Sequence, residues 1–301
     1  KIKVGKYMLP DLIPPSIQVY IINDGNALLI PAHKVSPRKP GIVRERLFVP
    51  EEYLNRISAC VRRVTEAEAY NAALKSLGLP TSGRGQGAVI LLVGPPGTGK
   101  TKTAELFAAE LNKPIIRVPA FSMAQPEALH KELSGEFKRA TTMGAVLLLD
   151  DAGALIKKRG EHPILDEVTS VLLRSLDDYN GIVFITSNHM DKIDQAVFSR
   201  CHLVLSYDRL ERDVRRKLWV AMLSGKLAES LIGDEERRER LYEELSGLEL
   251  DGREVETAIT NAVRRSIWEN NGKVPAGMAK WIQTRVIFEE AQNIAQSKQQ
   301  M

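Results

Sequence analysis

The sequence predicts an α/β fold: a doubly wound parallel sheet between layers of helices (αβα), followed by a small helical lid domain and preceded by an extended N-terminal arm. Five short apolar runs, at residues 88–93, 114–119, 145–149, 182–187 and 202–206, alternate with segments long enough for helices. Strands separated in this way indicate βαβ units and a parallel sheet. After Tyr207 the sequence has helical periods and no further strand run, which predicts a separate helical domain.

The length of the chain is consistent with two domains, since 301 residues compare with about 150 per domain. We expect an arm and linker at 1–49, the αβα domain at 50–207, the lid at 208–297 and a tail at 298–301. Two β-prone runs with turn formers between them predict a hairpin over 17–32. The αβα domain should open with one helix over 50–78. The expected lid helices are 211–231, 234–246, 252–271 and 278–297.

The composition excludes a membrane span and a cysteine-based scaffold. The longest unbroken apolar run, Ala88–Val93, is far shorter than the about 18 residues that suggest a spanning helix. Cys60 and Cys201 stand far apart and lack the spacing of a zinc site. This cysteine usage favours an intracellular, reducing compartment, the cytoplasm or the mitochondrial matrix.

The net charge of +4 is too small to imply a nucleic-acid binder unless basic residues gather in one place. Residues 34–46 contain five basic residues and one acidic residue. This stretch is either a solvated linker or a contact to phosphate, so a nucleic acid or a ribonucleoprotein remains open as a partner.

A glycine-rich turn follows the first predicted strand and precedes a predicted helix over 101–112. Its residues fit G-x-x-x-x-G-K-[ST]: Gly94, Pro95, Pro96, Gly97, Thr98, Gly99, Lys100 and Thr101. In this context backbone N–H groups and the helix N-terminus hold a phosphate chain. Lys100 is placed to reach the β- and γ-phosphates, and the Thr101 hydroxyl to bind Mg²⁺. The sequence therefore predicts a P-loop NTPase core that binds ATP and Mg²⁺.

A second element ends in two acids. The apolar run 145–149 is followed by Asp150 and Asp151. Beside a phosphate loop, Asp150 would hold Mg²⁺ through water and Asp151 would orient the attacking water. Alone, such a run is usually structural, but paired with the loop it predicts a nucleotide-hydrolysis site.

Over about residues 45–290 the chain resembles AAA+ ATPases, and within them the AAA-type members common in fungi and other eukaryotes. The resemblance depends on the loop, the acidic strand, the strand end Thr186–Asn188, Phe198-Ser199-Arg200, the helix start Val49–Glu52 and the lid segment Leu250–Arg253. It implies that the protein works as a homo- or hetero-oligomeric ring, expected to be a hexamer, or within a larger assembly.

The resemblance also implies roles for single residues. Asn188 is similar to the sensor that holds the attacking water, although a strand-end Asn also caps loops. Arg200 is similar to the arginine finger that reaches a neighbouring subunit's γ-phosphate, the alternative being an ordinary surface arginine. Arg253 is similar to the second sensor, or else forms a salt bridge at a helix start. Lys102, the next residue after the motif, is also expected to belong to the nucleotide-binding segment.

Departures from the family pattern leave the function open. Asp151 stands where the family usually has Glu, which predicts slow hydrolysis, and Phe121 and Met123 do not reproduce the pore-loop trio, so polypeptide threading is in doubt. Asp177 and Asp178, at a helix end, need no catalytic role. The expected function is an ATPase that remodels or assembles a protein complex. A slow ATPase acting as a nucleotide-stabilised scaffold and a nucleic-acid motor are the alternatives.

Overall fold

The computed structural model describes residues 3–4, 7–8, 16–20, 27–31, 47–79, 86–119, 126–158, 163–232, 234–270 and 282–299. The basic stretch 34–46, Phe121 and Met123 lie outside these ranges. The chain divides into two compact units, Lys1–Gly41 and Ile42–Met301.

The first unit contains two pairs of antiparallel strands. β1 (Lys3–Val4) pairs with β2 (Tyr7–Met8), and β3 (Ser16–Tyr20) pairs with β4 (Ala27–Pro31). In the longer pair the register places Ser16 opposite Pro31 and Tyr20 opposite Ala27.

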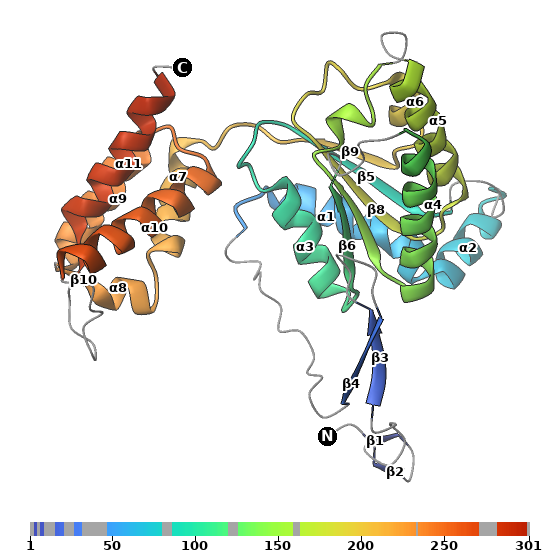
Figure 1. The fold of residues 1–301 in the computed structure, drawn as a ribbon, viewed down its shortest axis with the longest axis horizontal. Helices are drawn as coiled ribbons and strands as arrows, with labels where there is room; N and C mark the ends of the chain where they lie inside the picture. The colour runs from blue at the N-terminus through green and yellow to red at the C-terminus, as the bar shows by residue number, and fades with distance from the viewer. Residues whose placement is uncertain are drawn as a thin grey trace. The chain divides into compact units, whose positions relative to one another are not determined.

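A five-stranded sheet is the centre of the second unit (Figure 1). Its strands are β5 (Ala88–Val93), β6 (Ile115–Pro119), β7 (Val146–Asp150), β8 (Ile182–Ser187) and β9 (Leu203–Ser206). The order is β6-β7-β8-β5-β9 and every neighbouring pair is parallel. The α/β fold predicted from the apolar runs is therefore confirmed.

Helices follow the strands in the order that the sequence predicts, with one correction. They are α1 (Glu51–Thr65), α2 (Ala67–Ser76), α3 (Lys100–Glu110), α4 (Pro126–Met143), α5 (Pro163–Asp178) and the short α6 (Gln195–Phe198), with a 3₁₀ turn η5 (Ala152–Ala154). The expected single helix over 50–78 is two helices, because Glu66 leaves the helical region at φ −120° and ψ 40°. The fully buried side chains of α1 extend as far as Val61, whereas α2 buries none. The two segments therefore have no common packing surface that would keep them in one straight helix.

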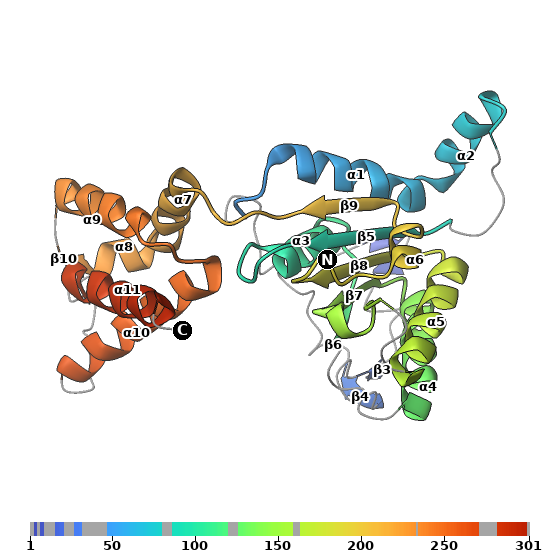
Figure 2. The same cartoon turned by 90° about the horizontal axis from the view of Figure 1, so that it is seen from above.

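Helices lie on both faces of the five-stranded sheet (Figure 2). Ile90, Leu148 and Phe184 join α1 and α3 in one hydrophobic cluster, in which the rings of Phe107 and Phe184 stack with centroids 6.2 Å apart. The opposite face of the sheet is covered by α4 and α5, which pack against each other. Each fully buried side chain of this kind contributes about 1.5–3 kcal/mol, so the sheet is a rigid base for the loops at its edge.

The C-terminal part is helical and has its own core around the fully buried Trp219. It comprises α7 (Arg212–Met222), α8 (Lys226–Ser230), α9 (Glu235–Gly247), α10 (Gly252–Glu269) and α11 (Thr284–Gln299). Two sequence predictions are wrong here. The expected helix 211–231 ends at Met222 and restarts at Lys226 after Gly225 with φ +63°. The expected absence of strands is overturned by β10 (Leu231–Ile232), which pairs in parallel with β11 (Ile282–Gln283).

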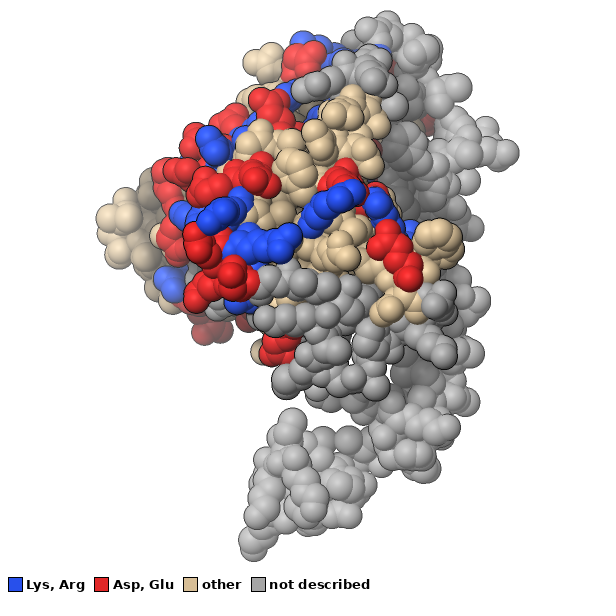
Figure 3. All heavy atoms as spheres, turned by 90° about the vertical axis from the view of Figure 1, so that its left-hand side faces the viewer, with Lys and Arg blue, Asp and Glu red and all other residues tan. Residues whose placement is uncertain are grey.

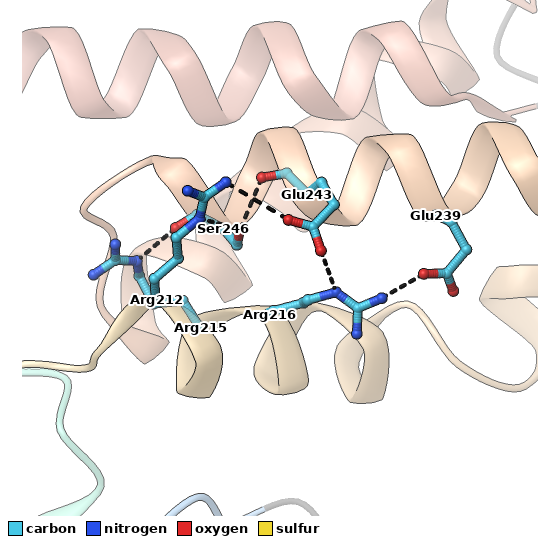
Figure 4. Close-up of polar contacts among 6 residues, drawn as sticks. All are labelled: Arg212, Arg215, Arg216, Glu239, Glu243 and Ser246. Carbon is cyan, nitrogen blue, oxygen red and sulfur yellow. Dashed lines mark hydrogen bonds and ion pairs between the residues drawn. The ribbon is translucent and has the colours of Figure 1, made fainter.

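Arginines of α7 hold α9 in place (Figure 4). Arg216 contacts the carboxylates of Glu239 and Glu243. Arg215 donates hydrogen bonds to the Ser246 carbonyl, at 2.9 Å, and to the Leu210 carbonyl, at 2.6 Å. Because Leu210 lies in the segment between β9 and α7, Arg215 also fixes the start of the helical domain.

Candidate active site

The phosphate-type loop begins where β5 ends, at the carboxyl edge of the sheet. Gly94 has φ +146°, and a Cβ there would lie 2.0 Å from the Tyr207 carbonyl oxygen, so only glycine fits beside the end of β9. Gly99, with φ +99°, is the N-cap of α3. The loop therefore ends with the free N–H groups of a helix N-terminus, which bind anions.

Lys100 is buried inside this loop and is 6% exposed. Its ammonium donates hydrogen bonds to the Gly94 and Pro95 carbonyls, both at 2.6 Å. Burial lowers the pKa of Lys100 from 10.5 to about 8, while the charges of Asp151 and Asp150 act in the opposite direction. The ammonium is thus poorly solvated and bonded to neutral carbonyl oxygens. Because its charge is little screened by water, it would bind a phosphate anion strongly.

The carboxylate of Asp150 joins the loop to two strands. Its Oδ1 accepts hydrogen bonds from the Thr101 hydroxyl at 2.7 Å and from the Thr186 hydroxyl at 2.9 Å. Its Oδ2 lies 3.7 Å from Nε of Arg117 on β6. The structure therefore brings the predicted pair Thr101 and Asp150 into direct contact, and adds Thr186 and Arg117 to them.

Asp151 and Asn188 are also brought together, with the Asn188 Nδ2 donating to Asp151 Oδ1 at 3.1 Å. Asp151 has a left-handed backbone, φ +52° and ψ 46°, and its N–H donates to the Thr186 hydroxyl at 2.8 Å. Asp and Asn adopt this region more readily than most residues because their short polar side chains bond locally. The exposed Asp151 carboxylate is thus held at the end of β7 beside the end of β8.

The start of α10 in the lid contacts the phosphate loop. The Gly252 N–H donates to the Gly97 carbonyl at 3.0 Å, and a Cβ on Gly97, whose φ is +71°, would lie 2.1 Å from the Asp251 carboxyl carbon. Asp251 caps the helix by accepting from the Arg253 and Glu254 backbones. Burial is the main cause of the lowered pKa of Lys100, and the charge of Arg253, at the start of α10, acts in the same direction.

Two other residues predicted for the site have different partners. The ammonium of Lys102 lies 3.5 Å from the Glu256 carboxylate on α10, which makes it a link between loop helix and lid. Arg200 bonds within its own chain, to Asp177 and to the Ala196 carbonyl, both at 3.0 Å. Since Arg200 precedes β9 and Asp177 ends α5, this pair lies at the amino end of the strands, away from the chain's own phosphate loop.

The residues around Asp150 and Gly97 include some that sequence reasoning missed. Arg117 and the helix cap Asp251 lie far along the chain from the residues that they approach, Asp150 and Gly97, and Glu105 contacts Arg117. Thr186 carried a signal as a polar residue at the end of an apolar strand, and Asp251 lies in the lid segment Leu250–Arg253 that carries the family resemblance.

The donors present suit a magnesium ion. A threonine hydroxyl and a carboxylate are hard oxygen ligands, and Mg²⁺ binds through one or two such groups together with water and phosphate oxygens. At 2.7 Å apart, the Thr101 hydroxyl and the Asp150 carboxylate are close enough to serve the same hydrated cation. Among the described residues there is no group of three or more His, Cys, Asp and Glu side chains of the kind that binds metal without a phosphate.

A phosphate loop and an acidic strand end on a parallel sheet of this order define a P-loop NTPase core. Residues 90–209 match the ATPase family associated with various cellular activities (AAA), so the chain contains an AAA-family ATPase domain. Within the described ranges, none of the helices has the length and apolarity needed to cross a membrane.

Curated relatives share this domain. The uncharacterized AAA family ATPase y4kL of Sinorhizobium fredii is 35% identical over 135 residues, which are 40% of this chain and 39% of that protein. ATPase family gene 2 protein homolog B of Bos taurus is 32% identical over 140 residues, 42% of this chain and 18% of that protein. The matched part thus spans well under half of these relatives.

A solved structure shares the fold over a longer stretch. A chain of the HORMA:CdnC:Trip13 complex of E. coli MS115-1 aligns with a TM-score of 0.59 and 17% identity. The alignment covers 82% of this chain and 89% of that one, so the likeness in fold includes part of the chain beyond the AAA match.

Proposed function

We propose that this AAA-family ATPase binds and hydrolyses ATP with Mg²⁺ in an oligomeric ring, expected to be a hexamer, and uses the cycle to remodel or assemble a protein complex. The observation that carries the proposal is the contact of Thr101 with Asp150 beside the buried Lys100. The free cysteines Cys60 and Cys201 favour a reducing compartment for this work, the cytoplasm or the mitochondrial matrix.

Each residue of the site has a chemical task in this proposal. Loop N–H groups and Lys100 bind the phosphate chain, and Lys100 exchanges its two carbonyl partners for phosphate oxygens. Thr101 and Asp150 would hold Mg²⁺, which when bound neutralises charge on the β- and γ-phosphates. Asp151 and Asn188 orient the attacking water, and Arg253 contacts phosphate from the lid.

Arg200 is proposed to act on the ATP of a neighbouring subunit. Its position before β9 is at the opposite end of the sheet from its own loop, which supports a role in trans. Its side chain is 29% exposed, and two of its five N–H groups are used by Asp177 and Ala196. A guanidinium with free donors suits a phosphoryl group whose charge is spread over several oxygens.

The proposal is tested by mixing two inactive variants. Arg200→Ala should bind ATP like the parent chain and lose about 10³-fold or more in hydrolysis, whereas Lys100→Ala should not bind ATP. A mixture should regain activity, because one interface then joins the intact Lys100 of one subunit to the intact Arg200 of the other. If neither variant lowers steady-state hydrolysis, the proposed site is wrong.

A slow, scaffold-like ATPase is the second candidate, and two observations favour it. Asp151 is one methylene shorter than the usual Glu, and Arg200 is already paired with Asp177 inside its own chain. ATP retained without turnover in the assembled protein would select this candidate. Multiple turnover would exclude it.

A nucleic-acid motor has less support. The stretch 34–46 was its basis, and on the face drawn in Figure 3 the described Lys and Arg side chains lie among Asp and Glu rather than in one basic patch. Binding that weakens steeply with salt would be required of such a motor.

A further inference from the structure

Arg117 shares its guanidinium between two carboxylates, one of which belongs to the proposed metal site. Its Nε lies 3.7 Å from Asp150 Oδ2, and its Nη2 donates a short hydrogen bond to Glu105 Oε1. Arg117 is on β6, the edge strand of the sheet, and Glu105 is on α3, the helix that begins with Lys100 and Thr101. The motifs that define the site do not include either residue.

The two contacts of Arg117 are unequal. The contact with Glu105 is a hydrogen-bonded ion pair, whereas 3.7 Å from Asp150 is too long for a hydrogen bond. Asp150 does not need Arg117 for its orientation, because the hydroxyls of Thr101 and Thr186 already fix its Oδ1. What Arg117 supplies to Asp150 is positive charge, at the oxygen that no neutral donor contacts among the described residues.

We infer that Arg117, held by Glu105, is also the counter-ion of Asp150 in the metal-free protein, and that a divalent cation at the Asp150 carboxylate replaces it and leaves Arg117 paired with Glu105 alone. Arg117 thereby competes with the cation for Asp150, and Glu105 limits the competition by holding the guanidinium. This inference rests on the proposed function, in which Asp150 helps to hold Mg²⁺. Arg117 acts through Asp150 and is therefore a positioning residue.

The test measures how Mg²⁺ strengthens the binding of a non-hydrolysable ATP analogue, by calorimetry over a Mg²⁺ series. Arg117→Gln should lower the Mg²⁺ concentration of half-maximal effect by about two- to fivefold, the range for a partly exposed ion pair. Glu105→Gln should raise it by a similar factor, because the freed guanidinium then pairs fully with Asp150. Binding of the analogue in EDTA should change little in either variant.

The double variant separates competition from simple field effects. If Glu105 acts only by holding Arg117, then Arg117→Gln with Glu105→Gln should behave like Arg117→Gln alone. If the charges of Arg117 and Glu105 act on the site independently, their opposite effects would cancel, and the double variant would need the same Mg²⁺ concentration as the parent chain. That result would overturn the inference. A weaker Mg²⁺ response in both single variants would also overturn it, since that is the result expected if Arg117 and Glu105 merely support the site.

Two controls keep this test apart from the proposed function. Arg240→Gln removes the same charge from an exposed pair with Glu236 on α9 and should leave the Mg²⁺ response unchanged. Asp150→Asn should abolish most of the response. If Asp150→Asn has no effect, the proposed metal site fails. If Asp150→Asn has its effect and Arg117→Gln matches the parent chain, only the inference about Arg117 fails.

Discussion

Among single residues, Lys100 gives the clearest pH dependence. Its folded pKa of about 8 is set mainly by burial, and the charged ammonium is the form that binds phosphate. The affinity for ATP should therefore be highest below pH 8, where Lys100 is charged, and should fall as the pH rises above 8. If only the charged form binds, the dissociation constant should rise about tenfold from pH 7 to pH 9, as one-proton linkage requires. Calorimetry in buffers of equal ionic strength measures this change.

The control for this effect is Lys100→Arg, whose guanidinium stays charged over the whole range. Its affinity is expected to be weaker than that of the parent but flat between pH 7 and pH 9. A parent chain with the same flat profile would show that another group controls the binding of ATP.

Asp151 combines an uncommon backbone with a short side chain. Asp151→Glu should raise the turnover number, because the longer side chain extends the carboxylate by up to about 1.5 Å, one C–C bond, and misplacement by about 1 Å can cost a hundredfold in rate. It should also lower the free energy of unfolding by up to about 1 kcal/mol, since Glu tolerates the left-handed region less well than Asp. Steady-state ATPase assays and urea titrations measure the two effects.

Asp151→Asn is the matched variant, because Asn keeps the backbone preference and removes the charge. We expect unchanged stability, nearly unchanged ATP affinity and a lower turnover number. If Asp151→Glu is slower than the parent, the left-handed backbone has adapted the site to the shorter acid, and the explanation from reach is wrong.

Local sequence patterns predicted that Thr101 and Asp150 belong to one site. They did not predict the neighbours of this site that come from distant parts of the chain. Parallel strands end at one edge, so a loop after β5 and acids after β7 lie on the same edge, with β8 between them. Nothing in the spacing of Arg117 or Asp251 indicates that they approach Asp150 and Gly97, because those contacts depend on how α3, β6 and the lid pack.

Among the elements, the five strands of the central sheet were predicted well, whereas the short strands β10 and β11 and the helix interruptions were not. Runs such as Ala88–Val93 are apolar because both faces are buried, and that pattern is visible in sequence. The break at Glu66 follows Val64 and Thr65, two β-branched residues of modest helix propensity, and precedes good helix formers. Packing on the sheet also ends here, since Val64 packs with the sheet's hydrophobic cluster while α2 buries no side chain, and such packing cannot be read from one segment.

The contact of α10 with the phosphate loop depends on the small size of Gly252. In Gly252→Ala the new Cβ would lie 2.9 Å from the Gly97 carbonyl oxygen, so the helix start must move away and the Gly252–Gly97 hydrogen bond must weaken. We expect ATP affinity to fall several-fold, by the about 1 kcal/mol that one such bond contributes. Calorimetric titration with ATP measures it.

Gly247→Ala serves as the control, since a Cβ at the last residue of α9 meets no atom within 4 Å. Its ATP affinity should equal that of the parent. Equal affinity in Gly252→Ala would mean that the lid contact does not contribute to nucleotide binding.

For the whole molecule, the separation of Arg200 from its own loop predicts assembly that depends on ATP. Nucleotide at one subunit would give the neighbour's Arg200 a partner that competes with Asp177. Native mass spectrometry should therefore detect larger particles when ATP is added to the parent chain, and none with Lys100→Ala. Identical particle sizes with and without ATP would contradict this expectation.

The segment from Leu47 to Val49 has a consequence for how the second unit melts. Leu47 and Val49 pack with the hydrophobic cluster of the sheet, whereas Phe48, between them, packs with the cluster of the helical domain. When either core unfolds, the segment 47–49 is freed and the other core loses a side chain that packs with it. The unfolding of the two cores is therefore coupled. Calorimetric melting of the intact chain should show one transition for both cores, and Phe48→Ala should separate it into two.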